Sequence, residues 1–111
     1  MPRRPRTATP APVFAALGDE NRLRLLAQLA SGRPMSISGL TVGSGITRQG
    51  VTKHLRVLAR AGLVRGSRRG KESLWQLERR RLEEARRSLD LISQQWDVSL
   101  GKLKLFVEEK T

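Results

Sequence analysis

Residues 46–77, ITRQGVTKHLRVLARAGLVRGSRRGKESLWQL, decide the fold of this chain. Apolar residues recur in the first half of this stretch at spacings of four and three, as on one face of a helix: Val51, Leu55 and Leu58. Thr47 is a natural N-cap for that helix, and Ala61-Gly62 is a natural stop. The spacing therefore predicts a helix between these signals, with polar side chains on its outward face.

The second half of the stretch has the pattern of a β-hairpin. Residues 63–67 and 72–77 are short runs suited to strands, and the basic segment 68–71 between them is predicted to form the turn, where glycine supplies a positive φ. Two-residue alternation places Trp75 and Leu77 on one face, which is expected to pack on the helices. A hairpin with a basic tip is therefore predicted directly after the helix.

Three further helices are predicted upstream of this stretch. The first covers residues 13–17 and ends at Gly18. The second begins at the N-cap Asp19 and is ended by the segment 31–34. The third begins at Ser36, and it is weak because glycines are frequent in and after it.

The chain of 111 residues has the length of one domain. Residues 1–12 hold four of the five prolines and three arginines, so they are predicted to form a flexible basic arm. Residues 13–78 are expected to form the core of helices and hairpin, and residues 79–111 a terminal helix of the same domain.

The predicted terminal helix has a stripe close to a heptad repeat. Its apolar residues alternate at spacings of three and four, with one step missing at Ser99: Leu82, Ala85, Leu89, Ile92, Trp96, Leu103 and Phe106. Gly101 is expected to kink or end the helix. An ordinary core-facing helix is the alternative, but a domain this small has too little core to cover so long a stripe. A dimer interface is therefore favoured.

The net charge of the chain limits the classes of partner that it is expected to bind. The net charge is +12, and residues 48–81 hold eleven Lys/Arg against two Asp/Glu. So large a charge on a compact domain usually persists because a polyanion neutralises it. Nucleic acid is the first candidate, an anionic membrane surface the second, and a merely solvated basic surface the third.

Several classes of site are excluded by composition. The chain has no cysteine and a single histidine, His54, so disulfides, thiolate metal sites and a multi-histidine zinc site within one chain cannot form. No Ser/Cys–His–acid set, phosphate-cradling loop or paired carboxylate points to an enzyme. No apolar run approaches the ~20 residues that cross a bilayer. We therefore expect no catalytic residue, cofactor, metal or membrane partner, and a cytoplasmic location.

The predicted elements form a recognisable order: a short helix, a glycine turn, a second helix with a polar face (the recognition helix) and a basic hairpin (the wing). In such a pair the second helix enters the major groove of double-stranded DNA. The side chains expected to contact bases or phosphates are Arg48, Gln49, Thr52, Lys53 and Arg56 on the recognition helix and Arg68, Arg69 and Lys71 on the wing.

Three motifs resemble the ArsR-type (ArsR/SmtB-like) winged helix-turn-helix regulators: LGDENRLRLL at 17–26, VTKHLRVLARAGLV at 51–64 and the glycine-tipped wing before LWQL at 74–77. The resemblance extends over roughly residues 13–109. It implies a mainly α fold with a small β-hairpin wing, and a homodimer that represses transcription from an inverted-repeat operator. It adds Thr47 to the DNA-binding set, together with His54 as either a phosphate contact or a structural hydrogen bond.

The resemblance also implies where two copies would meet. In the family the first and last helices form the dimer interface, and the matching residues here are Val13, Phe14, Leu17, Leu89, Ile92, Trp96 and Leu103. Metal-sensing members carry a cysteine pair, or paired His and Asp on the terminal helix, and this chain has neither. The ending QQWDVSLGKLKLFVEE is similar to a metal-independent branch. Metal sensing is therefore not expected, and a small-molecule inducer stays open.

Two other functions remain as alternatives. Because a fold does not fix a function, the chain could be a protein-interaction module that has lost DNA binding. An RNA-binding module is disfavoured, since RNA readers usually stack bases on exposed aromatic rings and only 4% of this chain is aromatic.

Overall fold

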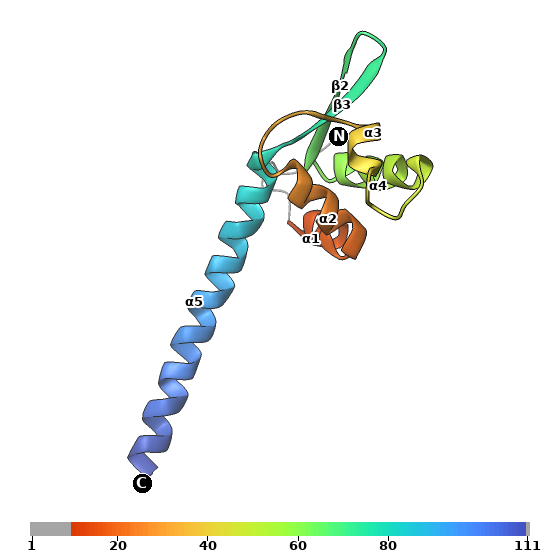
Figure 1. Cartoon of the computed structure of the whole chain (residues 1–111). Coiled ribbons are helices and arrows are strands. Elements are labelled where there is room, and N and C mark those ends of the chain that lie inside the picture. Colours follow the sequence, from red (N-terminus) through yellow and green to blue (C-terminus); the bar gives the residue numbers. More distant parts are fainter. Residues whose placement is uncertain (1–9, 111) are drawn as a thin grey trace, which may run out of the picture.

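A computed structural model describes residues 10–110 of the chain. Its elements are α1 (Ala11–Leu17), α2 (Glu20–Leu29), β1 (Met35–Ser36), α3 (Ile37–Thr41), α4 (Arg48–Arg60), β2 (Val64–Arg69), β3 (Glu72–Leu77) and α5 (Arg79–Lys110) (Figure 1). The chain is mainly helical with a small antiparallel sheet, which confirms the predicted fold class.

The predicted helix starts are confirmed by their caps. In each case the side-chain oxygen accepts a hydrogen bond from a backbone N–H two or three residues later: Asp19 for α2, Ser36 for α3 and Thr47 for α4. These contacts satisfy N–H groups that have no partner within the helix, which is why polar residues fix the helix starts.

The first helix begins earlier than predicted. α1 starts at Ala11 after the N-cap Pro10, so two residues assigned to the arm are helical. Pro12 is tolerated there because the N–H that proline lacks would have no intrahelical partner in the first turn. Residues 1–9, the rest of the predicted arm, lie outside the described residues.

The sheet has the strand order β1-β3-β2. The hairpin pairs Val64 with Leu77 and continues to Arg69 opposite Glu72, so the turn is Gly70-Lys71 and not the four residues predicted. Gly70 has the expected positive φ, 63°. The two-residue strand β1 was not predicted, and it pairs with β3 on the side away from β2.

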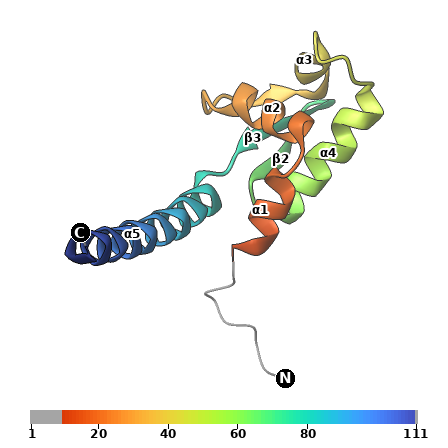
Figure 2. The same ribbon diagram turned by 90° about the horizontal axis from the view of Figure 1, so that it is seen from below.

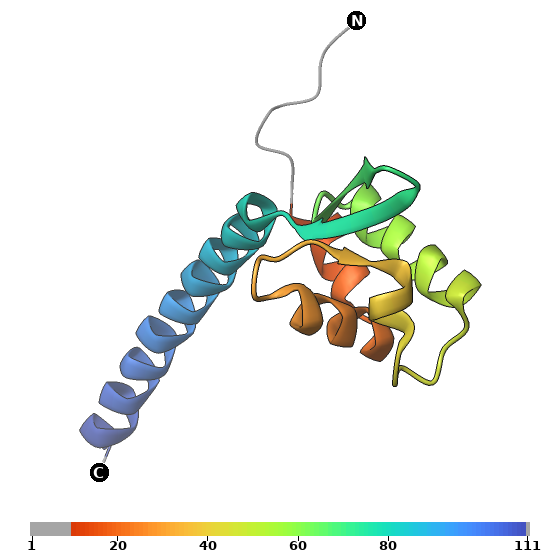
Figure 3. The ribbon, with the colours of Figure 1, turned by 45° about the horizontal axis from the view of Figure 1, so that its top comes forward.

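One hydrophobic core joins the helices to the sheet. Its largest fully buried side chains come from α1, α2, α3, α4 and the residue before β2: Val13, Leu25, Leu29, Leu40, Val51, Leu55, Leu58 and Leu63. Trp75 and Leu77 pack against this core as predicted. Figure 2 shows α1 alongside α4, and Figure 3 shows the strands along one side of the helices, with α5 leaving from the end of β3.

Only the beginning of α5 belongs to this core. Ala85 is buried and Leu82 partly buried, whereas all residues of 89–109 are exposed. Figure 1 shows α5 extending away from the other elements. The radius of gyration is accordingly 19.2 Å, against about 13 Å for a compact chain of this size. The helix continues unbroken through Gly101, so the predicted kink or end there is wrong. One glycine costs only about 1 kcal/mol in a helix, which its good helix-forming neighbours offset.

Candidate nucleic-acid interface

The outward face of α4 forms a shallow groove of about 470 Å³. Its lining consists of the polar side chains that the helical period places opposite the buried stripe: Arg48, Gln49, Thr52, Lys53 and Arg56. The structure thus brings together the five recognition-helix residues that were singled out as donors and acceptors. Their contact with DNA remains a prediction.

Hydrogen bonds within α4 determine which side-chain donors and acceptors remain available to a ligand. Thr52 Oγ1 donates to the carbonyl of Arg48 at 2.9 Å, so its oxygen is left as an acceptor. Thr47 Oγ1 accepts from the N–H of Gly50 at 3.0 Å and serves as the cap. The side chain of Gln49 makes no hydrogen bond with any described residue, so its amide can still both donate and accept.

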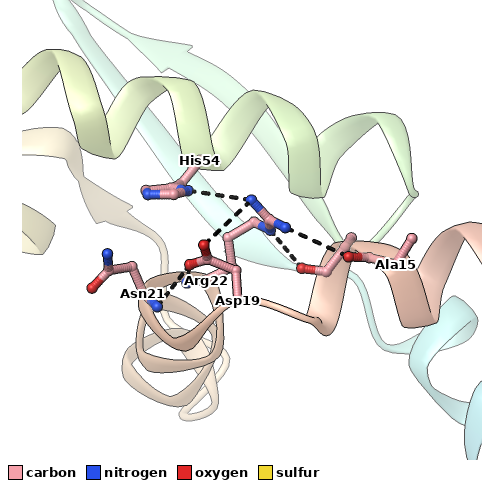
Figure 4. Close-up of polar contacts among 6 residues, drawn as sticks. Ala15, Asp19, Asn21, Arg22 and His54 are labelled. Atoms are coloured by element: carbon pink, nitrogen blue, oxygen red, sulfur yellow. Dashed lines mark hydrogen bonds and ion pairs between the residues drawn. The ribbon is translucent and has the colours of Figure 1, made fainter.

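His54 lies apart from this groove, on the side of α4 that faces α2 (Figure 4). Its Nδ1 is 3.5 Å from Nη1 of Arg22. The same guanidinium donates to the carbonyls of Ala15 and Ala16, and it lies 4.0 Å from the carboxylate of Asp19. Of the two roles expected for His54, this geometry supports the structural hydrogen bond: Arg22 ties α4 to the α1–α2 junction.

Asp19 is the acidic member of this cluster. The backbone N–H of Arg22 donates to its carboxylate at 3.1 Å and lowers its pKa below the ordinary 3.8, against a smaller opposing effect of desolvation. The N–H of Asn21 and the positive charge of Arg22 lower the pKa further. The charged form of Asp19 is therefore favoured by folding.

An Asp19→Asn variant keeps an oxygen for the cap but removes the charge. Because folding lowers the pKa of Asp19, its charge stabilises the folded chain above the unfolded-state pKa, and this contribution is lost as the pH falls through the lower folded-state value. The wild-type free energy of unfolding is therefore expected to fall relative to that of Asp19→Asn as the pH is lowered from about 5 through the range in which Asp19 becomes protonated. Urea unfolding of both proteins tests this, and a pH-independent difference would contradict it.

Side-chain contacts hold the base of the hairpin, whereas the basic side chains at its tip make none with the described residues. At its base, Arg65 contacts the Glu78 carboxylate and the Gln76 side-chain oxygen, each at 3.3 Å, and the Gln76 amide donates to the Gly32 carbonyl at 3.0 Å. At its tip, the exposed wing residues make no side-chain hydrogen bond or ion pair with any described residue: Arg68, Arg69 and Lys71. The tip cations are available to an external anion.

The charge around α4 and the hairpin has one sign over a long stretch of chain. Between Glu20 and Glu72 the sequence has no Asp or Glu and eleven Lys/Arg. This stretch includes all of α3, α4 and β2. Carboxylates are thus absent from the groove lining, and the field attracts a polyanion to this face.

The residues expected at a dimer interface divide into two groups. Val13 is only 2% exposed and belongs to the core of its own chain, so its assignment to the interface is corrected. Phe14 and Leu17 also pack on that core but keep some exposed surface. The α5 residues are all about half exposed: Leu89, Ile92, Trp96 and Leu103.

A second apolar stripe on α5 was missed. Leu91, Val98 and Leu105 recur every seven residues and are exposed. At about 100° per residue they lie nearly opposite the stripe that contains Trp96. The spacing is visible in the sequence, but the three-four alternation beside it obscures it.

Two other kinds of site have no support within residues 10–110. No helix in this range has the length and apolar character needed to cross a bilayer. No three potential metal ligands among His, Asp and Glu gather in this range.

Comparisons with known proteins find similarity to helix-turn-helix proteins. A family model described as a helix-turn-helix domain matches residues 17–67. The Bacillus subtilis (strain 168) protein named uncharacterized HTH-type transcriptional regulator YuzN is 40% identical over 65 residues, which are 53% of this chain and 71% of that protein.

Solved structures extend the similarity to the whole fold. An ArsR-like transcriptional regulator from Rhodococcus sp. RHA1 has a TM-score of 0.75 and 34% identity, covering 87% of this chain and 91% of that one. The homodimeric winged helix-turn-helix DNA-binding domain of Mycobacterium bovis Mb0332, a possible ArsR-family regulator, has a TM-score of 0.59 and 26% identity, covering 81% and 80%.

Proposed function

Because the chain belongs to the ArsR family of helix-turn-helix transcriptional regulators, a non-enzymatic DNA-binding class, we propose that it is a homodimeric repressor. It acts in the cytoplasm by occupying an inverted-repeat operator. The α4 groove gives this proposal its main support, because polar side chains without a carboxylate face outward beside the unpaired cations of the wing. In this arrangement α4 enters the major groove and the hairpin lies on the flanking backbone.

The groove residues divide by chemistry into base readers and phosphate contacts. Gln49 and Thr52 are uncharged, so their contribution is hydrogen bonding to base edges. Because its proton is engaged by the Arg48 carbonyl, Thr52 is suited to accept from a base amino group. Arg48 can contact either a base or a phosphate. The other cations of the groove and the wing neutralise phosphates: Lys53, Arg56, Arg68, Arg69 and Lys71.

Dimerisation is supported by the apolar surface of α5. Within residues 89–109, ten large hydrophobic side chains are exposed. Apolar surface on this scale marks an interaction site in a chain that stays in solution. A two-fold axis through α5 gives a self-complementary contact, and the similar domain of Mycobacterium bovis is homodimeric.

The proposal is tested by binding to the DNA upstream of the protein's own gene. We expect that duplex to bind at least about 10³-fold more tightly than a scrambled duplex of equal length, and added protein to lower transcription from it in vitro. If neither duplex is bound, the protein-interaction alternative replaces this function. If the upstream duplex is bound but transcription rises, the protein is an activator.

Metal-independent regulation is the second part of the proposal. It is supported by the donor set, because zinc needs three or four ligands and the chain has no cysteine and one histidine, which contacts Arg22. Titration with zinc, copper, nickel or cadmium is expected to leave operator affinity unchanged. A tenfold loss reversed by chelator would contradict this, and an Asp90→Asn, Asp97→Asn variant would show whether carboxylates on α5 hold the ion.

A further inference from the structure

We propose that a cavity between the start of α4 and the turn of the hairpin binds one phosphodiester phosphate of the DNA backbone. The cavity has a volume of about 150 Å³. Its polar lining comes from the end of β1, the start of α3, the start of α4, the turn of the hairpin and the start of β3: Ser36, Ser38, Arg48, Lys71, Glu72 and Ser73. The inference rests on the proposed DNA-binding function and adds a shared phosphate site to it.

Two cations give the cavity its charge. Arg48 comes from α4 and Lys71 from the turn of the hairpin, and neither side chain makes a hydrogen bond or ion pair with any described residue. Glu72 is the single carboxylate in the lining, and it forms no ion pair with either cation. The cavity therefore keeps a net positive charge, as an anion site requires.

Three hydroxyl groups supply further donors. Ser36 Oγ accepts from the N–H of Gly39 at 3.0 Å, so its own proton remains available. The side chains of Ser38 and Ser73 make no hydrogen bond with any residue of 10–110. Guanidinium, ammonium and hydroxyl donors are the groups that bind phosphate oxygens. No aromatic ring lines the cavity, so a stacked base is not its ligand.

The cavity assigns a role to Arg48, for which chemistry alone permits a base contact or a phosphate contact. Arg48 borders both this cavity and the α4 groove. A phosphate held jointly by Arg48 and Lys71 fixes the wing relative to α4 on the backbone. Such a contact carries no sequence information and sets the register in which Gln49 meets base edges.

The salt dependence of binding to a scrambled duplex tests the shared site. Counterion release counts the phosphates that are neutralised, at about 0.9 in the log–log slope per phosphate. Arg48→Ala or Lys71→Ala alone leaves the phosphate with one cation, so each is expected to reduce the slope by well under 0.9 per protomer. The double variant is expected to reduce it by about 0.9 per protomer, more than the two single effects together.

A matched pair outside the cavity serves as the control. Arg56 lies on α4 and Arg68 on the wing, and their alanine variants are expected to change the slope additively. Ser73→Ala is expected to weaken binding several-fold with an unchanged slope, because it removes a donor and no charge. All variants should unfold at the wild-type temperature, since each altered side chain lies at the surface or on the cavity wall.

The measurements distinguish a failure of the shared phosphate site from a failure of the proposed DNA-binding function. Additive slopes for Arg48 and Lys71, or no slope change in the double variant, would overturn the shared phosphate and leave DNA binding intact. A wild-type protein that binds no duplex would overturn the proposed function and the cavity with it.

Discussion

Trp96→Ala is expected to raise the dissociation constant of the homodimer by about 10²–10⁴-fold. Trp96 lies in the middle of the exposed part of α5, and the residue is 62% exposed in the single chain. Burying a large apolar side chain contributes about 1.5–3 kcal/mol, and a two-fold interface contains the residue twice. Sedimentation equilibrium over a concentration series measures the change.

Two leucines on the same helix provide a matched control. Leu103 belongs to the stripe of Trp96 and Leu105 to the opposite stripe, and both are about equally exposed. Leu103→Ala is expected to weaken the dimer, and Leu105→Ala to leave it nearly unchanged. A larger effect of Leu105→Ala would assign the interface to the second stripe, and a wild type that is monomeric at tens of micromolar would refute the dimer.

Gln49→Ala and Arg69→Ala are expected to change DNA binding in different ways. Loss of a base-edge contact by Gln49→Ala is expected to cost about 1–3 kcal/mol on the operator and little on scrambled DNA. Arg69 is a free cation at the wing tip, so Arg69→Ala is expected to weaken both duplexes alike. It should also reduce the salt slope by roughly 1 per contact, or about 2 per dimer.

Affinities for both duplexes at several salt concentrations separate the two roles. Arg24→Ala is the control for losing one positive charge, since Arg24 lies on α2 and pairs with Glu20 at 2.8 Å. It is expected to leave the slope nearly unchanged. If Gln49→Ala lowers both affinities equally while Arg69→Ala spares scrambled DNA, the assigned roles are reversed and the orientation of α4 on DNA is wrong.

Local signals in the sequence were sufficient for most of the fold. Caps at Asp19 and Thr47 and the three-four spacing of α4 depend only on neighbouring residues, so both helices could be predicted with their starts. β1 could not, because two residues are too few for an alternating pattern and the strand exists through its pairing with β3. The length of the turn likewise depends on the pairing of Arg69 with Glu72.

In the candidate site, too, local sequence patterns were sufficient for some residues, and the roles of others depend on packing. The five groove residues could be predicted because the helical period that buries Leu55 leaves them outward. The contact of His54 with Arg22 depends on the packing of α2 on α4, which no local pattern contains. Val13 shows a related limit, since an apolar residue on a helix stripe can face its own core or a partner, and only the packed chain distinguishes the two.

A hydroxyl-radical footprint of the wild-type protein on its upstream DNA tests the proposed mode of action most directly. Two α4 helices related by a two-fold axis are expected to protect two half-sites of inverted sequence, with centres about 34–36 Å apart or a multiple of that distance. Scrambled DNA at the same protein concentration should show no such pattern. A single protected patch without symmetry, or equal protection of both DNAs, would contradict a dimer that reads its operator through α4.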